Sequence, residues 1–185
     1  MTDPTGKLET HLKAFLVLVA VVSAAVQGGC TSGTDRKNLP EPVSHADRIA
    51  LLVPENAIHN WDGAPGLDGV MAQIMLFKNE TKGPKSVLVN GEVDLMLFEG
   101  AKPDNADNIP KPFFSQTFTA GELARSVVGQ YNTLWGYSLR LQWLTAPKTK
   151  NVWLIARYRP PTGRPIYSSP AEQRMPAKSL KPQAN

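Results

Sequence analysis

Alternating apolar and polar residues predict a chain built mainly of β-strands. Residues 136–143 and 152–158 show the pattern most clearly. Because successive side chains of a strand point to opposite faces, each segment predicts a strand with one buried face. The apolar positions are Tyr137, Leu139, Leu141 and Trp143 in the first strand, and Val152, Leu154, Ala156 and Tyr158 in the second. We expect these strands to pair antiparallel with Trp143 opposite Val152, since that register puts both apolar sets on one face.

Five further segments have strand-like patterns: 49–53, 69–77, 86–99, 113–118 and 164–168. Both alternating sets of 69–77 are largely apolar, which predicts a central strand. Segment 86–99 contains Asn90-Gly91, which is compatible with a two-residue hairpin turn or with a bulge in one continuous strand. We favour the bulge, because the arm before Asn90 is only four residues long.

A single short helix is predicted between the strands. Thr119 and Glu122 have the spacing of a capping box, which favours a helix near 120–128. The chain has 16 prolines, and none lies in 69–77, 86–99, 136–143 or 151–159. The predicted fold is therefore all-β: a single antiparallel β-sandwich of about seven strands, in the size class of immunoglobulin and transthyretin domains.

The amino-terminal region has the pattern of an export signal. Residues 14–26 contain no charged side chain. A helix of this length would cover about 20 Å, which is short of the roughly 30 Å hydrocarbon core of a bilayer. The length instead fits the apolar region of a signal peptide. Lys7 and Lys13 precede it and are offset by Asp3 and Glu9.

The sequence that ends this apolar region is Gln27-Gly28-Gly29-Cys30. It resembles the lipobox of bacterial lipoproteins, although that family prefers an apolar residue where Gln27 stands. The resemblance implies that Cys30 receives a diacylglyceryl group and fatty acyl chains of the palmitate class, and becomes the new amino terminus. Ordinary secretion with an incidental cysteine, or an uncleaved anchor, are the alternatives. Thr31 is not the Asp that retains enterobacterial lipoproteins in the inner membrane, so the resemblance favours the outer membrane.

The predicted organisation has four parts. Residues 1–29 form the signal peptide, 30–48 the lipidated cysteine and a flexible tether, 49–168 the sandwich, and 169–185 a disordered tail. The formal net charge of +4 over 185 residues indicates no dense basic surface, so nucleic acid is not an expected partner.

Several segments beyond Trp61 resemble a group of small exported lipoproteins from planctomycete-type bacteria. The similar segments are Trp61-Asp-Gly, Pro65–Val70, Gly91–Phe98, Gly136–Trp143 and Arg157–Arg164. They consist of turn and strand patterns. The resemblance implies an exported all-β domain and no established activity.

Catalytic and metal-binding motifs are absent from the sequence. It contains one cysteine and three histidines, without a nucleophile elbow, a His-Glu-x-x-His motif or a phosphate-binding loop. We therefore expect neither an enzyme nor a cofactor. Asp104 and Asp107 are candidate calcium ligands, although Asx residues also stabilise turns without any ion.

One candidate ligand face follows from the expected strand pairing. It places Arg140, Gln142, Trp153 and Arg157 together on the outer face, where they could bind a glycan or an acidic protein. In the alternative interpretation, Trp153 and Ile155 pack under a loop and an arginine stacks on the indole ring. The function expected is a non-catalytic envelope lipoprotein that binds or scaffolds a protein or glycan. The alternatives are a secretion-apparatus lipoprotein of the outer membrane and a carbohydrate-binding module.

Overall fold

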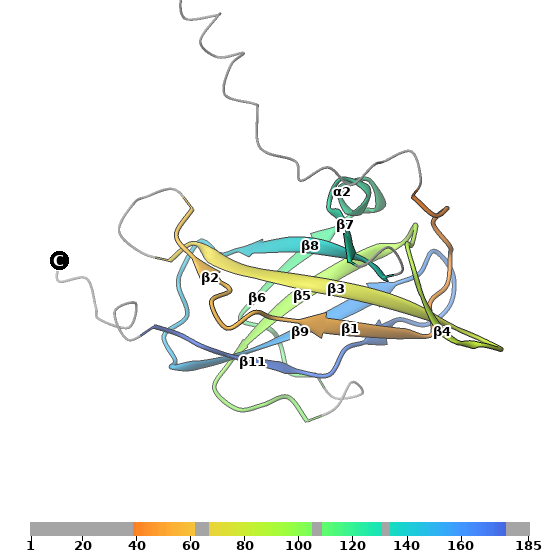
Figure 1. Cartoon of the computed structure of the whole chain (residues 1–185). Coiled ribbons are helices and arrows are strands. Elements are labelled where there is room, and N and C mark those ends of the chain that lie inside the picture. Colours follow the sequence, from red (N-terminus) through yellow and green to blue (C-terminus); the bar gives the residue numbers. More distant parts are fainter. Residues whose placement is uncertain (1–38, 62–66, 105–108, 131–133, 177–185) are drawn as a thin grey trace, which may run out of the picture. The chain divides into compact units, whose positions relative to one another are not determined.

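The computed structural model describes residues 39–61, 67–104, 109–130 and 134–176 of the chain. Within these residues, the strands form a six-stranded and a five-stranded sheet, both antiparallel. Figure 1 shows the two sheets as layers that face each other. This confirms the prediction of an all-β sandwich.

The first sheet has the order β1 (Arg48–Leu52), β3 (Gly69–Glu80), β8 (Leu134–Gln142) and β7 (Val127–Gln130), with β2 (Ile58–His59) and β4 (Gly83–Val87) also paired with β3. The second sheet has the order β10 (Ile166–Tyr167), β9 (Asn151–Arg159), β5 (Glu92–Glu99) and β6 (Phe114–Phe118), with β11 (Ala171–Arg174) paired with β9. The helix α2 (Ala120–Arg125) connects β6 to β7.

The core lies between the two sheets and is made by the predicted apolar faces. Tyr137, Leu139 and Leu141 of β8 are at most 1% exposed, as are Val152, Leu154, Ala156 and Tyr158 of β9. On β3, the inward set of Val70, Ala72, Ile74 and Leu76 is equally buried. For β8 and β9, the alternation in the sequence therefore identified correctly which side faces the core. For β3, both alternating sets are largely apolar, and the sequence did not indicate which of them faces the core.

The predicted pairing of β8 with β9 is wrong. β8 pairs with β3 and β7 in the first sheet, whereas β9 pairs with β5, β10 and β11 in the second. Their apolar faces lie in one core across the sandwich instead of side by side in one sheet. The pattern could not separate these arrangements, because both bury the same side chains.

The Asn90-Gly91 segment is neither a hairpin turn nor a bulge. β4 ends at Val87 in the first sheet and β5 begins at Glu92 in the second, so residues 88–91 carry the chain from one layer to the other. Gly91 lies against β9, where an added Cβ would overlap the carbonyl oxygen of Arg159 and lie 2.6 Å from Cε2 of Tyr158. Glycine therefore allows the crossover to approach β9 closely.

The predicted helix is confirmed but is shorter than expected. The Glu122 carboxylate accepts hydrogen bonds from the backbone amide and the hydroxyl of Thr119, both at 2.8 Å. Helix α2 then ends at Arg125, and Val127 begins β7. The predicted span to 128 therefore included the first residues of a strand.

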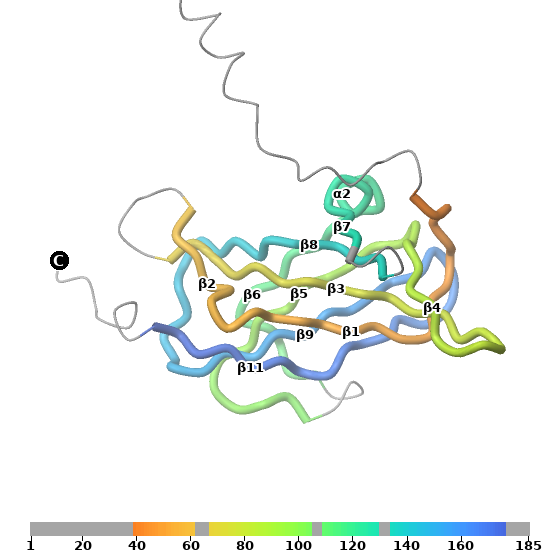
Figure 2. Tube along the Cα trace, viewed as in Figure 1, coloured from red at the N-terminus to blue at the C-terminus, as the bar shows by residue number. Residues whose placement is uncertain are grey.

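The sandwich extends beyond both of its predicted boundaries, residues 49 and 168. On the amino-terminal side, Val43 forms a parallel bridge with Val89, and Ala46 is 1% exposed. On the carboxyl-terminal side, β11 pairs with β9, and Figure 2 shows the two running together. Residues 39–48 are thus not a tether, and 169–176 are not a disordered tail. The signal peptide, Cys30 and residues 177–185 lie outside the described residues.

Candidate functional site

The four residues of the predicted ligand face lie on two different sheets. Arg140 and Gln142 point outward from β8 in the first sheet, while Trp153 and Arg157 point outward from β9 in the second. The structure therefore does not bring them together as one surface. The reason is the wrong strand pairing, because the outer faces of the two sheets lie on opposite sides of the sandwich.

Trp153 belongs to a small apolar cluster on the outer face of the second sheet. The cluster contains Met96, Phe98 and Ile155, each less than 5% exposed, with Ile109 and Trp153 packed against it. The Trp153 indole N–H donates to the carbonyl oxygen of Gly100 at 3.0 Å. The ammonium of Lys102 lies 5.8 Å from the ring centroid, in the place where an arginine was expected. These contacts give Trp153 a packing role beneath the loop after β5.

Arg157 and Arg159 share one buried carboxylate. Asp94 is 1% exposed and accepts hydrogen bonds from Arg157 Nε at 2.7 Å and from Arg159 Nε at 2.9 Å. Thr117 Oγ1 donates to the same carboxylate at 2.6 Å. Burial alone would raise the pKa of Asp94, but the hydrogen bonds from Arg159, Thr117 and Arg157 outweigh it and hold the pKa below its ordinary value. Asp94 therefore remains ionised and fixes both guanidinium groups.

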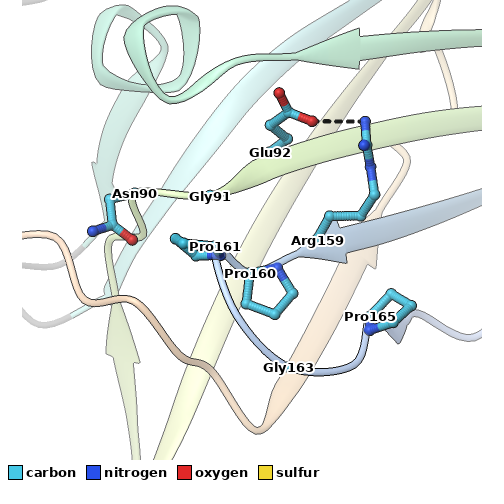
Figure 3. A pocket seen from close by; sticks show the side chains of 8 residues that line it. All are labelled: Asn90, Gly91, Glu92, Arg159, Pro160, Pro161, Gly163 and Pro165. Carbon is cyan, nitrogen blue, oxygen red and sulfur yellow. Dashed lines mark ion pairs between the residues drawn. The ribbon is translucent and has the colours of Figure 1, made fainter.

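A pocket of about 450 Å³ lies beside this cluster at one end of the sandwich. Figure 3 shows the rings of Pro160, Pro161 and Pro165 around it, and the ion pair between Glu92 and Arg159 beside them. The Glu92 carboxylate is 2.8 Å from the Arg159 guanidinium. Because Arg159 also pairs with Asp94, the cationic group of this pocket is already neutralised by the protein.

A polar groove of about 370 Å³ lies where β6, α2 and β8 meet. We call it the β8 groove. Its lining residues are Gln116 and Phe118 of β6, Glu122, Arg125 and Ser126 of and after α2, and Ser138, Leu139, Arg140 and Gln142 of β8. Two residues of the predicted ligand face, Arg140 and Gln142, are therefore in this groove.

The backbone of β8 is open toward this groove. β7 covers β8 only as far as Tyr137. Beyond it, the amide of Ser138 donates to the carbonyl oxygen of Ser126 at 2.9 Å, and the amide of Gln142 donates to Oε1 of Gln116 at 3.2 Å. Because backbone groups alternate in direction along a strand, the N–H and C=O of Arg140 also point to this side. They lie between two amides that the protein itself satisfies.

The arginines of the groove differ from those around Asp94. Among the ion pairs that the structure describes, none includes Arg125 or Arg140. The Arg140 guanidinium lies 5.6 Å from the centroid of the Trp61 ring. The Glu122 carboxylate accepts from the Thr119 backbone and hydroxyl, and these hydrogen bonds lower its pKa. The charge of the nearby Arg125 lowers the pKa of Glu122 further. The groove therefore contains two arginines outside the described ion pairs and one ionised carboxylate near Arg125.

The structure describes only one of the two candidate calcium ligands. Asp104 is exposed, and Asp107 lies outside the described residues. Within the described residues, no group of three His, Cys, Asp or Glu side chains could hold a metal ion. None of the described helices has the length and hydrophobicity needed to cross a bilayer.

Sequence reasoning missed Arg125, Gln116 and Asp94 as partners in these clusters. A signal for Asp94 existed, since a carboxylate alternates with Val93 and Leu95 in a strand that is otherwise apolar. No comparable signal marked Arg125, because its place beside β8 depends on the path of the chain after α2. The chain matches no protein-family model, no curated protein and no solved structure in the comparisons made.

Proposed function

We propose that this chain is a cell-envelope lipoprotein that presents its β-sandwich as a binding or scaffolding module and has no catalytic activity. The observation that carries the proposal is the position of Cys30, the only cysteine, directly after the apolar residues 14–26. Only residues 31–38 separate it from Leu39, where the described sandwich begins. Acylation at Cys30 would thus place the sandwich close to a membrane surface, and Thr31 favours the outer membrane.

The arrangement of charged groups supports binding over catalysis. Asp94 is enclosed by two arginines and Thr117, and Glu122 caps a helix. General acid–base catalysis needs a titratable group that can exchange a proton with a substrate. Both of these carboxylates instead have lowered pKa values and structural partners. The β8 groove, with its open backbone groups and available arginines, has the features of a recognition site.

The first experiment tests membrane attachment through Cys30 by fractionation of the envelope. Cys30→Ala should move the exported protein from the membrane fraction to the soluble fraction of the envelope. Each buried CH₂ of an acyl chain contributes about 0.8 kcal/mol to membrane binding, so the loss of two or three chains removes the anchor. Ser32→Ala is the matched control, because it makes a similarly small change two residues away and should leave the protein membrane-bound.

The result that contradicts the proposal is equally clear. If the Cys30→Ala protein is exported and still sediments with membranes, lipid at this position does not hold the domain. If the wild-type protein is found in the cytoplasm with Met1 intact, the chain is not exported as proposed.

A further inference from the structure

The β8 groove carries a net positive charge, because two arginines and one glutamate line it. Arg125 and Arg140 line it without an ion pair among the described residues, whereas Arg157 and Arg159 are both committed to Asp94. Glu122 lines it as well and stays negatively charged near Arg125, so it offsets one of the two arginine charges and leaves the other without a counter-charge. The groove therefore favours a ligand with negative charge.

The groove also offers main-chain hydrogen-bonding groups. The N–H and C=O of Arg140 point into it between the satisfied amides of Ser138 and Gln142. An exposed strand edge pairs readily with the backbone of another extended chain. The side chains of Ser138 and Gln142, within the part of the chain that is described, form no hydrogen bond with the protein and can contact such a ligand.

The aromatic residues disfavour a sugar as the ligand. Binding by stacking requires a ring with an open face. Trp143 is 5% exposed, and Trp153 is held by Gly100 and Lys102 on the second sheet. Trp61, the indole nearest to Arg140, already stacks on His59 with ring centroids 5.9 Å apart and has the Arg140 guanidinium over it.

We infer that the β8 groove binds an acidic segment of a partner polypeptide in an extended conformation. One residue of the segment pairs through its backbone with the N–H and C=O of Arg140, and neighbouring carboxylates meet the guanidinium groups of Arg125 and Arg140. This inference rests on the proposed binding function and gives it a site and a ligand class. It does not depend on Cys30, so membrane release of Cys30→Ala and peptide binding succeed or fail independently.

The test uses the full chain in a nonionic detergent and a fluorescent hexaglutamate peptide with blocked ends, with binding measured by fluorescence anisotropy. Arg125→Gln and Arg140→Gln should each weaken binding about tenfold, since each removes a charge-assisted hydrogen bond worth about 1.5 kcal/mol. Arg164→Gln is the matched control, because it removes the same charge from an exposed position between β9 and β10. It should leave affinity within about twofold of wild type, because a screened surface charge contributes little.

A second probe tests the main-chain contact. Two hexaglutamate peptides carry N-methyl groups on alternate residues, one on the odd-numbered and one on the even-numbered residues. Each keeps every carboxylate but loses half of its backbone N–H donors. They should bind more weakly than the unmodified peptide, and the unmodified peptide should shift the backbone amide resonance of Arg140 in a ¹⁵N-labelled chain.

Four results would overturn the inference. The first is no binding of hexaglutamate, and the second is a loss of affinity with Arg164→Gln equal to the loss with Arg125→Gln and Arg140→Gln. The third is an affinity of both N-methylated peptides equal to that of the unmodified peptide. The fourth is tighter binding of an oligogalacturonate than of a hexaglutamate with the same charge. The last result would assign the groove to an acidic glycan instead of a polypeptide.

Discussion

Replacing Asp94 by asparagine tests the energetic role of the buried carboxylate. Asp94 accepts four hydrogen bonds at 2.6–3.0 Å, from Thr117 once, Arg157 once and Arg159 twice. Asparagine has nearly the same shape, but its NH₂ group is a donor facing donors. About half of these hydrogen bonds are therefore lost, together with the charge that holds two guanidinium groups.

The loss of stability expected for Asp94→Asn depends on how exposed the two arginine partners of Asp94 are. Removing one member of a buried ion pair costs about 3–5 kcal/mol when the other charge is left without solvent. Here the Arg157 and Arg159 side chains are 32% and 41% exposed, so water can partly replace the lost carboxylate. Losing two hydrogen bonds to charged groups then reduces the free energy of unfolding by about 2–3 kcal/mol.

The assay is urea unfolding at neutral pH, followed by tryptophan fluorescence, with Glu92→Gln as the control. Glu92 lies on the same strand and pairs with the same Arg159, but its side chain is 43% exposed. Its loss should lower the free energy of unfolding by at most about 0.5 kcal/mol, as is usual for surface ion pairs. An Asp94→Asn effect below about 0.5 kcal/mol, or one equal to that of Glu92→Gln, would refute this account of the cluster.

Further predictions concern acid, the crossover and a buried hydroxyl. Because the pKa of Asp94 is held below its ordinary value, this carboxylate takes up a proton at a higher pH in the unfolded chain than in the folded one. The difference in free energy of unfolding between wild type and Asp94→Asn should therefore be largest above about pH 5 and shrink below about pH 4. A difference that grows in acid would contradict this. Gly91→Ala should destabilise the fold by about 3 kcal/mol in urea unfolding, because the added Cβ meets Tyr158 and Arg159. The control Gly121→Ala in α2, where nothing lies within 4 Å of the added Cβ, should be neutral or stabilise by up to about 0.5 kcal/mol. Equal effects of the two substitutions would argue against the close approach of Gly91 to β9. Tyr137→Phe should lower the free energy of unfolding by about 1–2 kcal/mol in the same assay, because the Val89 amide that donates to the Tyr137 hydroxyl at 2.7 Å becomes unsatisfied in the core. An unchanged unfolding midpoint would show that water or another group accepts the hydrogen bond from Val89 instead.

The sequence allowed the long strands β3, β5, β8 and β9 to be located but did not allow their neighbours to be identified. Alternation identified the buried faces of β8 and β9, because inward and outward positions differ in polarity. It could not distinguish pairing within a sheet from packing across the core, since both arrangements bury the same side chains. Strand β11 escaped detection because it is a four-residue edge strand with the sequence Ala-Glu-Gln-Arg and carries almost no apolar signal.

The candidate site was predictable only in part, for the same reason. Arg140 and Gln142 were recognised as outward-facing residues of β8, and both line the β8 groove. Trp153 and Arg157 were assigned to the same face only through the wrong strand pairing. Arg125 joins the groove because α2 returns the chain to β7 beside β8, and such a path is set by tertiary packing.

Mass spectrometry of the native protein, purified from envelope membranes, tests the central claim most directly. The account predicts a chain that begins at Cys30, with a mass increased by a diacylglyceryl group and further acyl chains on that residue. A product that retains Met1, or a chain with a free thiol at position 30, would contradict it.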